Sequence, residues 1–155
     1  NAQFAIEHGA KQISKKDALN ILREAKNHGL VHKAIHAYLN PENIEVTICN
    51  CCKCCCITFQ CYYRGMTPMY SLTSYVSNVD VDSCIGCSTC VDICPTEAAE
   101  LIDMISVINQ NKCIGCGLCA YHCPENAIKL ERSGPRNVFI PPPKISENSP
   151  KLIHT

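Results

Sequence analysis

The sequence contains no Trp, and its 155 residues include only six Tyr and three Phe. Apolar residues make up 46% of the chain, but that figure includes cysteine, so the conventional hydrophobic core is smaller than the percentage suggests. No uninterrupted apolar run is long enough to form a membrane-spanning helix. Burial of hydrophobic side chains alone therefore stabilises this chain only weakly, and another kind of interaction must contribute to its stability.

The sequence also lacks the signatures of several functional classes. It has no glycine-rich phosphate-binding loop, no nucleophile elbow and no carboxylate pair suited to acid-base catalysis. No basic segment followed by an apolar stretch and a small-residue cleavage site marks the chain for export. The first residue is Asn1 rather than Met, and we expect this sequence to be part of a larger chain or complex.

Cysteine is the residue that the sequence has in excess, with 15 copies. Such a content indicates either a secreted disulfide scaffold or an intracellular protein that binds metal clusters. An odd number of cysteines does not suit a fully paired disulfide framework, and no export signal accompanies them. We therefore expect a cytoplasmic protein that binds metal clusters.

Eight of the cysteines form an internal repeat. Residues 84–95 read Cys-Ile-Gly-Cys-Ser-Thr-Cys-Val-Asp-Ile-Cys-Pro, and residues 113–124 read Cys-Ile-Gly-Cys-Gly-Leu-Cys-Ala-Tyr-His-Cys-Pro. Both copies have the spacing C-x2-C-x2-C-x3-C-P. Two-residue spacers let successive sulfurs converge on one cluster, while the backbone amides of the loop face its negative charge. A pair of zinc sites with four thiolates each is the alternative that the spacing leaves open.

This repeat resembles the bacterial-type ferredoxins that carry two [4Fe-4S] clusters, and the resemblance covers residues 75–132. In that family the fourth cysteine of each run binds the other cluster. The resemblance therefore implies one cluster held by Cys84, Cys87, Cys90 and Cys123, and a second held by Cys113, Cys116, Cys119 and Cys94. It also implies low-potential one-electron centres in a pseudo-twofold β-α-β domain.

Charge is unevenly distributed along the chain. Residues 75–132 carry eight acidic and three basic residues, although the whole chain has a net charge of zero. Two bound clusters would add further negative charge to this region. We expect a redox partner protein with a basic docking surface, and we do not expect nucleic acid as a partner. The alternative is that the acidity only keeps a small domain soluble.

The remaining seven cysteines lie in a segment, residues 49–61, that ordinary ferredoxins lack: Cys49, Cys51, Cys52, Cys54, Cys55, Cys56 and Cys61. Cys49, Cys52 and Cys55 repeat the spacing C-x2-C-x2-C. We expect a third iron-sulfur centre here, with a zinc site, a redox-active disulfide and no bound species as alternatives. The fourth ligand would be Cys61 or a histidine, for which His32 is the candidate. The segment resembles those of uncharacterised anaerobe iron-sulfur proteins, a resemblance that implies no activity.

The expected fold class is α+β, in four parts. These are a small helical N-terminal region (1–48), a Cys-rich connector with the possible third metal site (49–74), the ferredoxin domain (75–132) and a Pro-rich extended tail (133–155). Short strands are predicted within the domain at residues 75–81, 104–108 and 127–130, with a helical turn or two between them.

The N-terminal region shows local helix and strand signals. Ser14, followed three residues later by Asp17, predicts the start of a helix that ends at Gly29. Residues 30–39 predict a second helix, on which His32 and His36 would share one face. Residues 44–48 alternate between apolar and polar and predict a strand. The two predicted helices resemble a helix-turn-helix, but no basic recognition face accompanies them, so we do not expect DNA binding.

The function expected from these patterns is one-electron transfer through two [4Fe-4S] clusters, in a module or subunit of a larger, anaerobic oxidoreductase. We expect an electron-transfer module rather than a stand-alone enzyme. One alternative is an iron-sulfur reductase whose Cys-rich segment carries a third, catalytic metal centre. Another is a sensor that responds to redox state through its thiols or a metal.

Overall fold

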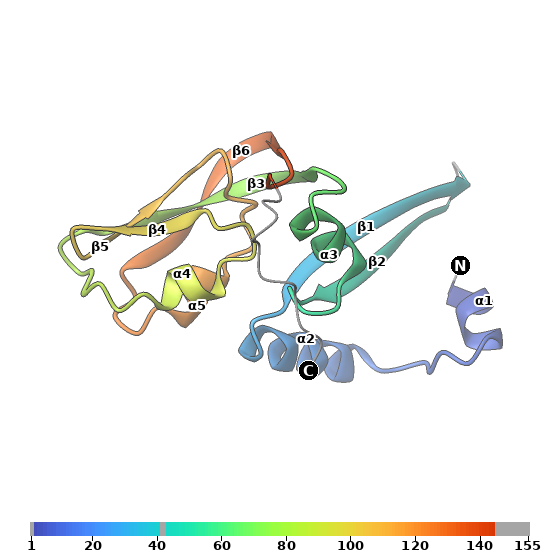
Figure 1. Cartoon of the computed structure of the whole chain (residues 1–155). Coiled ribbons are helices and arrows are strands. Elements are labelled where there is room, and N and C mark those ends of the chain that lie inside the picture. Colours follow the sequence, from blue (N-terminus) through green and yellow to red (C-terminus); the bar gives the residue numbers. More distant parts are fainter. Residues whose placement is uncertain (1, 41–42, 145–155) are drawn as a thin grey trace. The chain divides into compact units, whose positions relative to one another are not determined.

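The computed structural model describes residues 2–40 and 43–144 and divides into two compact units, Asn1–Cys51 and Cys52–Thr155. We call these the N-terminal unit and the C-terminal unit (Figure 1). The last part of the predicted Pro-rich tail, residues 145–155, lies outside the described residues. Within the described ranges, no helix is long and apolar enough to cross a membrane.

The N-terminal unit contains α1 (Ala2–Glu7), α2 (Lys15–Asn27), β1 (Val31–Asn40) and β2 (Asn43–Cys51). At the start of α2, the Ser14 side chain accepts a hydrogen bond from the backbone N–H of Asp17 at 3.1 Å. At its end, Gly29 has a φ of 71° and the Leu30 N–H donates to the Ala25 carbonyl at 2.9 Å. Both ends confirm the helix that the capping signals predict.

The predicted second helix over residues 30–39 is wrong, because this segment forms strand β1. β1 pairs antiparallel with β2, in a register that places Val31 opposite Cys51 and Ile35 opposite Thr47. The strand predicted at residues 44–48 is confirmed within β2, and its backbone groups need a hydrogen-bonding partner. β1 supplies that partner, so strand pairing overrides the modest helix propensity of the segment.

The C-terminal unit contains α3 (Ile57–Tyr63), β3 (Met69–Val79), α4 (Thr89–Ile93), β4 (Ala99–Ile102), β5 (Ile105–Ile108), α5 (Leu118–His122) and β6 (Ile128–Ile140). From β3 onward, the order strand, helix, strand occurs twice. β3 pairs with β6, and β4 pairs with β5, both antiparallel. The predicted strands are confirmed for the residues that overlap β3, β5 and β6, whereas residues 80–81, 104 and 127 lie just outside them, and the helical turns correspond to α4 and α5. The mixture of helices and small sheets agrees with an α+β class.

The pairing of β3 with β6 extends beyond residues 75–132, the range expected for the ferredoxin domain, at both ends. Met69 lies opposite Ile140 and Thr73 lies opposite Arg136, with an irregularity between Thr73 and Tyr75. Residues 133–140, which the sequence places in the tail, are therefore part of a paired strand. Residues 69–74, assigned to the connector, form the other half of the same ladder.

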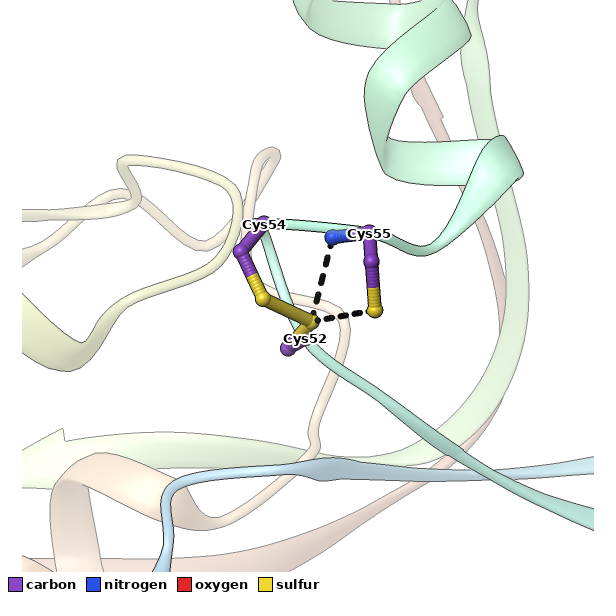
Figure 2. A group of neighbouring side chains, drawn as sticks. All are labelled: Cys52, Cys54 and Cys55. Atoms are coloured by element: carbon purple, nitrogen blue, oxygen red, sulfur yellow. Dashed lines mark hydrogen bonds between the residues drawn. A yellow bond between two sulfur atoms is a disulfide. The ribbon is translucent and has the colours of Figure 1, made fainter. Parts of the chain in front are cut away.

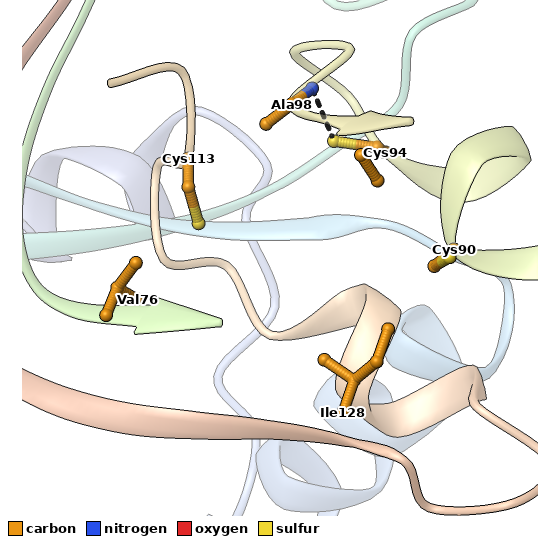
Figure 3. Close-up of a cluster of buried hydrophobic side chains, with 7 residues drawn as sticks. Val76, Cys90, Cys94, Ala98, Cys113 and Ile128 are labelled. Carbon is orange, nitrogen blue, oxygen red and sulfur yellow. Dashed lines mark hydrogen bonds between the residues drawn. The ribbon is translucent and has the colours of Figure 1, made fainter. Parts of the chain in front are cut away.

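The core of the C-terminal unit is built largely from small residues and cysteines. Its buried cluster comprises Val76, Cys90, Cys94, Ala98, Ala99, Cys113 and Ile128, most of which are labelled in Figure 3. Three of these seven residues are cysteines from the repeat. The residues with metal-binding spacing therefore also fill the centre of the unit.

We predict that Gly115→Ala destabilises the protein more than Gly134→Ala does. Both glycines have positive φ angles, 66° and 80°, so alanine strains the backbone at either position. A Cβ at Gly115 would also collide with Thr73 Oγ1 and the Tyr75 carbonyl, whereas nothing lies within 4 Å of a Cβ at Gly134. The extra cost is about 2 kcal/mol, measurable as a lower thermal midpoint by circular dichroism. Equal midpoints for the two variants would contradict the close packing of this loop on β3.

Candidate metal centres

Each cysteine repeat forms a loop that leads into a short helix. The residue before α4 is Ser88 and the residue before α5 is Gly117, with left-handed φ angles of 64° and 74°. Cys94 and Cys123 follow the two helices in extended conformation. A proline comes directly after each of these cysteines and disfavours a helical conformation there, which explains why the helices are short. The same local conformations therefore occur in both repeats.

Two hollows lie beside the loops, both partly open to solvent. The cysteines around the first are Cys84, Cys87, Cys90 and, from the second repeat, Cys123. Those around the second are Cys113, Cys116, Cys119 and, from the first repeat, Cys94. Each cavity thus has three cysteines from one repeat and one from the other. Four thiols around one cavity suit a cluster held by four cysteine thiolates.

Three buried hydroxyl groups contact these sulfurs, and no sequence signal beyond their residue type indicates this role. Ser77, Thr96 and Ser106 are 1%, 1% and 3% exposed. The Cys119 thiol donates to Ser77 Oγ at 3.2 Å, and the Cys90 thiol donates to Ser106 Oγ at 3.1 Å. When either sulfur is a thiolate, the hydroxyl donates to it instead, so the buried serines suit the charged form of the ligand.

Backbone amides also donate to the sulfurs. The Ala98 N–H donates to Cys94 Sγ at 3.2 Å, as Figure 3 shows, and the Ser106 N–H donates to Cys84 Sγ at 3.4 Å. Ala98 is 1% exposed, so this donor is shielded from water. Hydrogen bonds of this kind stabilise a thiolate and a negatively charged cluster bound to it.

The cysteine side chains differ in how readily they lose a proton. Burial raises the pKa of Cys116 to about 12 and also raises the pKa of Cys119. The hydrogen bond with Thr89 lowers the pKa of Cys87. A metal or cluster in the second cavity must therefore displace thiol protons as it binds, as cysteine ligands generally require.

Arg136 on β6 fixes the second loop, although the sequence places it in the tail. Its Nη1 donates to the Gln110 carbonyl at 2.7 Å. Its Nη2 donates to the Tyr75 carbonyl at 3.3 Å and to the Cys113 carbonyl. A planar guanidinium can span several carbonyls in this way, whereas a lysine cannot. Arg136 therefore ties β6, β3 and the first cysteine of the second loop together.

The Cys-rich segment brings three of its seven cysteines together. Cys52 and Cys54 form a disulfide, and Cys55 Sγ lies 3.2 Å from Cys52 Sγ (Figure 2). The three sulfurs lie within 4.8 Å of one another, a group that could hold a metal ion. Among the described residues, no other set of His, Cys, Asp or Glu side chains meets the same criterion. The eight repeat cysteines need not lie this close together, because a cubane cluster binds its four cysteine ligands at four different irons.

The other four cysteines of the segment are not part of this group. Cys49 and Cys51 are in β2, while Cys56 precedes α3 and Cys61 lies within it. His32 pairs with Asn50 in the hairpin, and its Nδ1 lies 2.7 Å from Asn50 Oδ1. Because side chains alternate along a strand, His32 faces away from Cys49 and Cys51. The structure thus does not bring His32 to these two cysteines.

The comparison with protein families agrees with this arrangement. A family model described as a 4Fe-4S binding domain matches residues 78–100 and again residues 106–129. Each match contains one complete cysteine repeat. The two matches support a ferredoxin-like iron-sulfur domain, whose chemistry is electron transfer. No curated protein matches the chain.

We predict that Arg136→Lys loosens the second cysteine loop. Lysine keeps the positive charge but cannot make the same set of hydrogen bonds, and a hydrogen bond to a charged group is worth about 1.5–3 kcal/mol. Amide hydrogen exchange in residues 109–119 should become about tenfold faster or more, measured by mass spectrometry. Arg132→Lys, on an exposed position of the same strand, is the matched control and should leave this exchange unchanged. Similar rates in the two variants would exclude the role assigned to Arg136.

Proposed function

We propose that this protein transfers single electrons through two [4Fe-4S] clusters, one in each cavity. The proposed ligands are Cys84, Cys87, Cys90 and Cys123 for the first cluster, and Cys113, Cys116, Cys119 and Cys94 for the second. The observation that supports this most strongly is the lining of the cavities, where each set of four thiols surrounds one hollow. The family match over both repeats supports the same chemistry.

In this proposal the bound clusters supply one-electron chemistry at low potential. The chain holds them and adjusts how easily they are reduced. Buried donors such as Ser77, Ser106 and the Ala98 amide face the ligand sulfurs and offset negative charge there. Such hydrogen bonds favour the reduced, more negative state and so raise the potential.

The partner that we propose is a redox protein with a basic docking surface. The acidic excess of residues 75–132 supports this, since opposite charges steer two proteins together. Cys87 is exposed, while the other seven repeat cysteines are buried or half-buried. Glu125 lies near enough to act on the Cys87 charge and lines the same cavity. We therefore propose that the partner approaches at the first cavity.

The chemistry of such centres indicates the kind of cell in which this chain works. Low-potential clusters and closely spaced thiols are sensitive to oxidation. We propose that the chain works as a module or subunit of an oxidoreductase in the cytoplasm of an anaerobic or strongly reducing cell.

The direct test of the proposed cofactors is the metal content of the full chain. Anaerobically prepared protein should contain about eight iron and about eight acid-labile sulfide per chain, measured alongside zinc. Cys123→Ala should lower the iron content to about four, since it removes one ligand of the first cluster only. Zinc in place of iron would overturn the proposal.

The second test concerns the hydrogen bond from Ser77. Ser77→Ala removes the hydroxyl that faces Cys119 Sγ at 3.2 Å, so the reduced form of the second cluster loses a stabilising donor. We expect the potential of that cluster to fall by about 40 mV, which corresponds to about 1 kcal/mol. A redox titration followed by electron paramagnetic resonance measures both clusters. The first cluster is the internal control, and an unchanged second potential would refute the role of Ser77.

A further inference from the structure

We propose that Cys52 and Cys54 are a second redox centre, a disulfide that accepts two electrons from the iron-sulfur domain and passes them to the disulfide bond of a substrate. This rests on the proposed function, because the iron-sulfur domain is the source of the electrons. It adds a chemical activity, disulfide reduction, to a chain whose repeats account only for electron transfer.

The first argument is the geometry of the three sulfurs in Figure 2. Cys54 is exposed and can meet a substrate, whereas Cys52 is half-buried. The backbone N–H of Cys55 donates to Cys52 Sγ at 3.2 Å. A donor at that sulfur stabilises the thiolate form of Cys52, which makes it the better leaving group when the disulfide opens. The pair thus has one sulfur for the substrate and one that is held within the protein.

The second argument is the attachment of this loop to the iron-sulfur domain within the same compact unit. Lys53, between the two cysteines, donates from Nζ to the Asp92 carbonyl at 3.3 Å. The Tyr63 hydroxyl, at the end of α3, donates to the Pro95 carbonyl. Cys94, which lines the second cavity, lies between these two anchor points. One lysine side chain therefore separates the disulfide loop from the segment that carries Cys94.

The third argument is that the loop is held in place from the other side as well. Gln60, on α3, donates from Nε2 to the Lys53 carbonyl at 2.7 Å and to the Cys54 carbonyl at 3.2 Å. The loop between Cys52 and Cys54 is therefore fixed between α3 and the Asp92 segment. Such a fixed position beside an electron-transfer domain is what an electron acceptor requires.

The reaction balances in two stages. The Cys52–Cys54 bond breaks as it takes up two electrons and two protons and becomes two thiols, one electron coming from each half of the domain. The Cys54 thiolate then attacks a substrate disulfide, breaks it and releases one substrate thiol. The Cys52 thiolate attacks Cys54 Sγ in the mixed disulfide, releases the second substrate thiol and restores the Cys52–Cys54 bond. The net change is one substrate disulfide, two electrons and two protons converted to two thiols.

A single metal ion at the same sulfurs is the competing possibility. Zinc in a structural site has four ligands, with sulfurs about 3.8 Å apart for a Zn–S distance of 2.3 Å. The described residues bring only three such groups together, and two of those sulfurs are bonded to each other. Sulfurs in a disulfide are not thiolate ligands, so the structure favours the redox pair.

The experiment counts electrons. The full chain, prepared anaerobically with its iron-sulfur clusters, is titrated with a one-electron donor, reduced methyl viologen, in the wild type, in Cys54→Ser and in Ile57→Ser. The last is a control on an exposed residue of the same segment, 75% exposed. We expect about four electrons per wild-type or Ile57→Ser chain, two for the clusters and two for the disulfide, and about two for Cys54→Ser. Alkylation after an acid quench should show two new thiols, at Cys52 and Cys54, only after reduction. The reduced wild type should then return about four electrons to excess cystine, because the clusters reduce the disulfide again after its first turnover.

The outcomes separate the two proposals. Cluster signals with about two electrons in the wild type would overturn the disulfide centre and leave the proposed function intact. Zinc, or a third iron centre, at Cys52, Cys54 and Cys55 would do the same. A chain that carries no iron-sulfur cluster would overturn the proposed function and this inference with it.

Discussion

One cysteine from each repeat lies at the cavity of the other repeat, and the C-terminal unit depends on this exchange. Cys94 and Cys123 each stand between a short helix and a proline, so the chain must turn there. The turn directs each sulfur toward the opposite loop. Each cavity takes its fourth thiol from the other repeat, so both halves contribute to both cavities and the two similar sequences form one unit.

The same cysteines serve as core residues and as candidate ligands. Cys90, Cys94 and Cys113 belong to the buried cluster, in a chain that has no Trp and few other aromatic residues. Protonated thiols behave as small apolar groups, whereas thiolates require donors. Buried hydroxyls such as Ser77 and Ser106 provide those donors. The interior therefore suits a charged group better than a conventional hydrophobic core would.

Parts of the chain outside the repeat position the candidate sites. Arg136, near the end of β6, donates to the carbonyls of Gln110 and Cys113 at the start of the second loop and of Tyr75 on β3. α3 and Lys53 hold the disulfide loop against the segment that contains Cys94. The proposed electron path from clusters to disulfide depends on these contacts, because they hold the disulfide loop beside the segment that carries Cys94. In this proposal, α3 and the Cys-rich loop before it add a second redox-active group to a ferredoxin-like domain.

Local signals in the sequence by itself determine one helix and the two cysteine loops of this protein. The capped helix from Ser14 to Gly29 and the two cysteine loops depend on residues a few positions apart, so spacing was enough to predict them. The strand at residues 31–40 was not predictable, because its conformation depends on pairing with β2. Only the tertiary structure decided that Arg136 supports the second loop and that Cys52, Cys54 and Cys55 are the three cysteines of seven that converge. Their meeting is set by the path of the backbone between β2 and α3, which no spacing rule fixes.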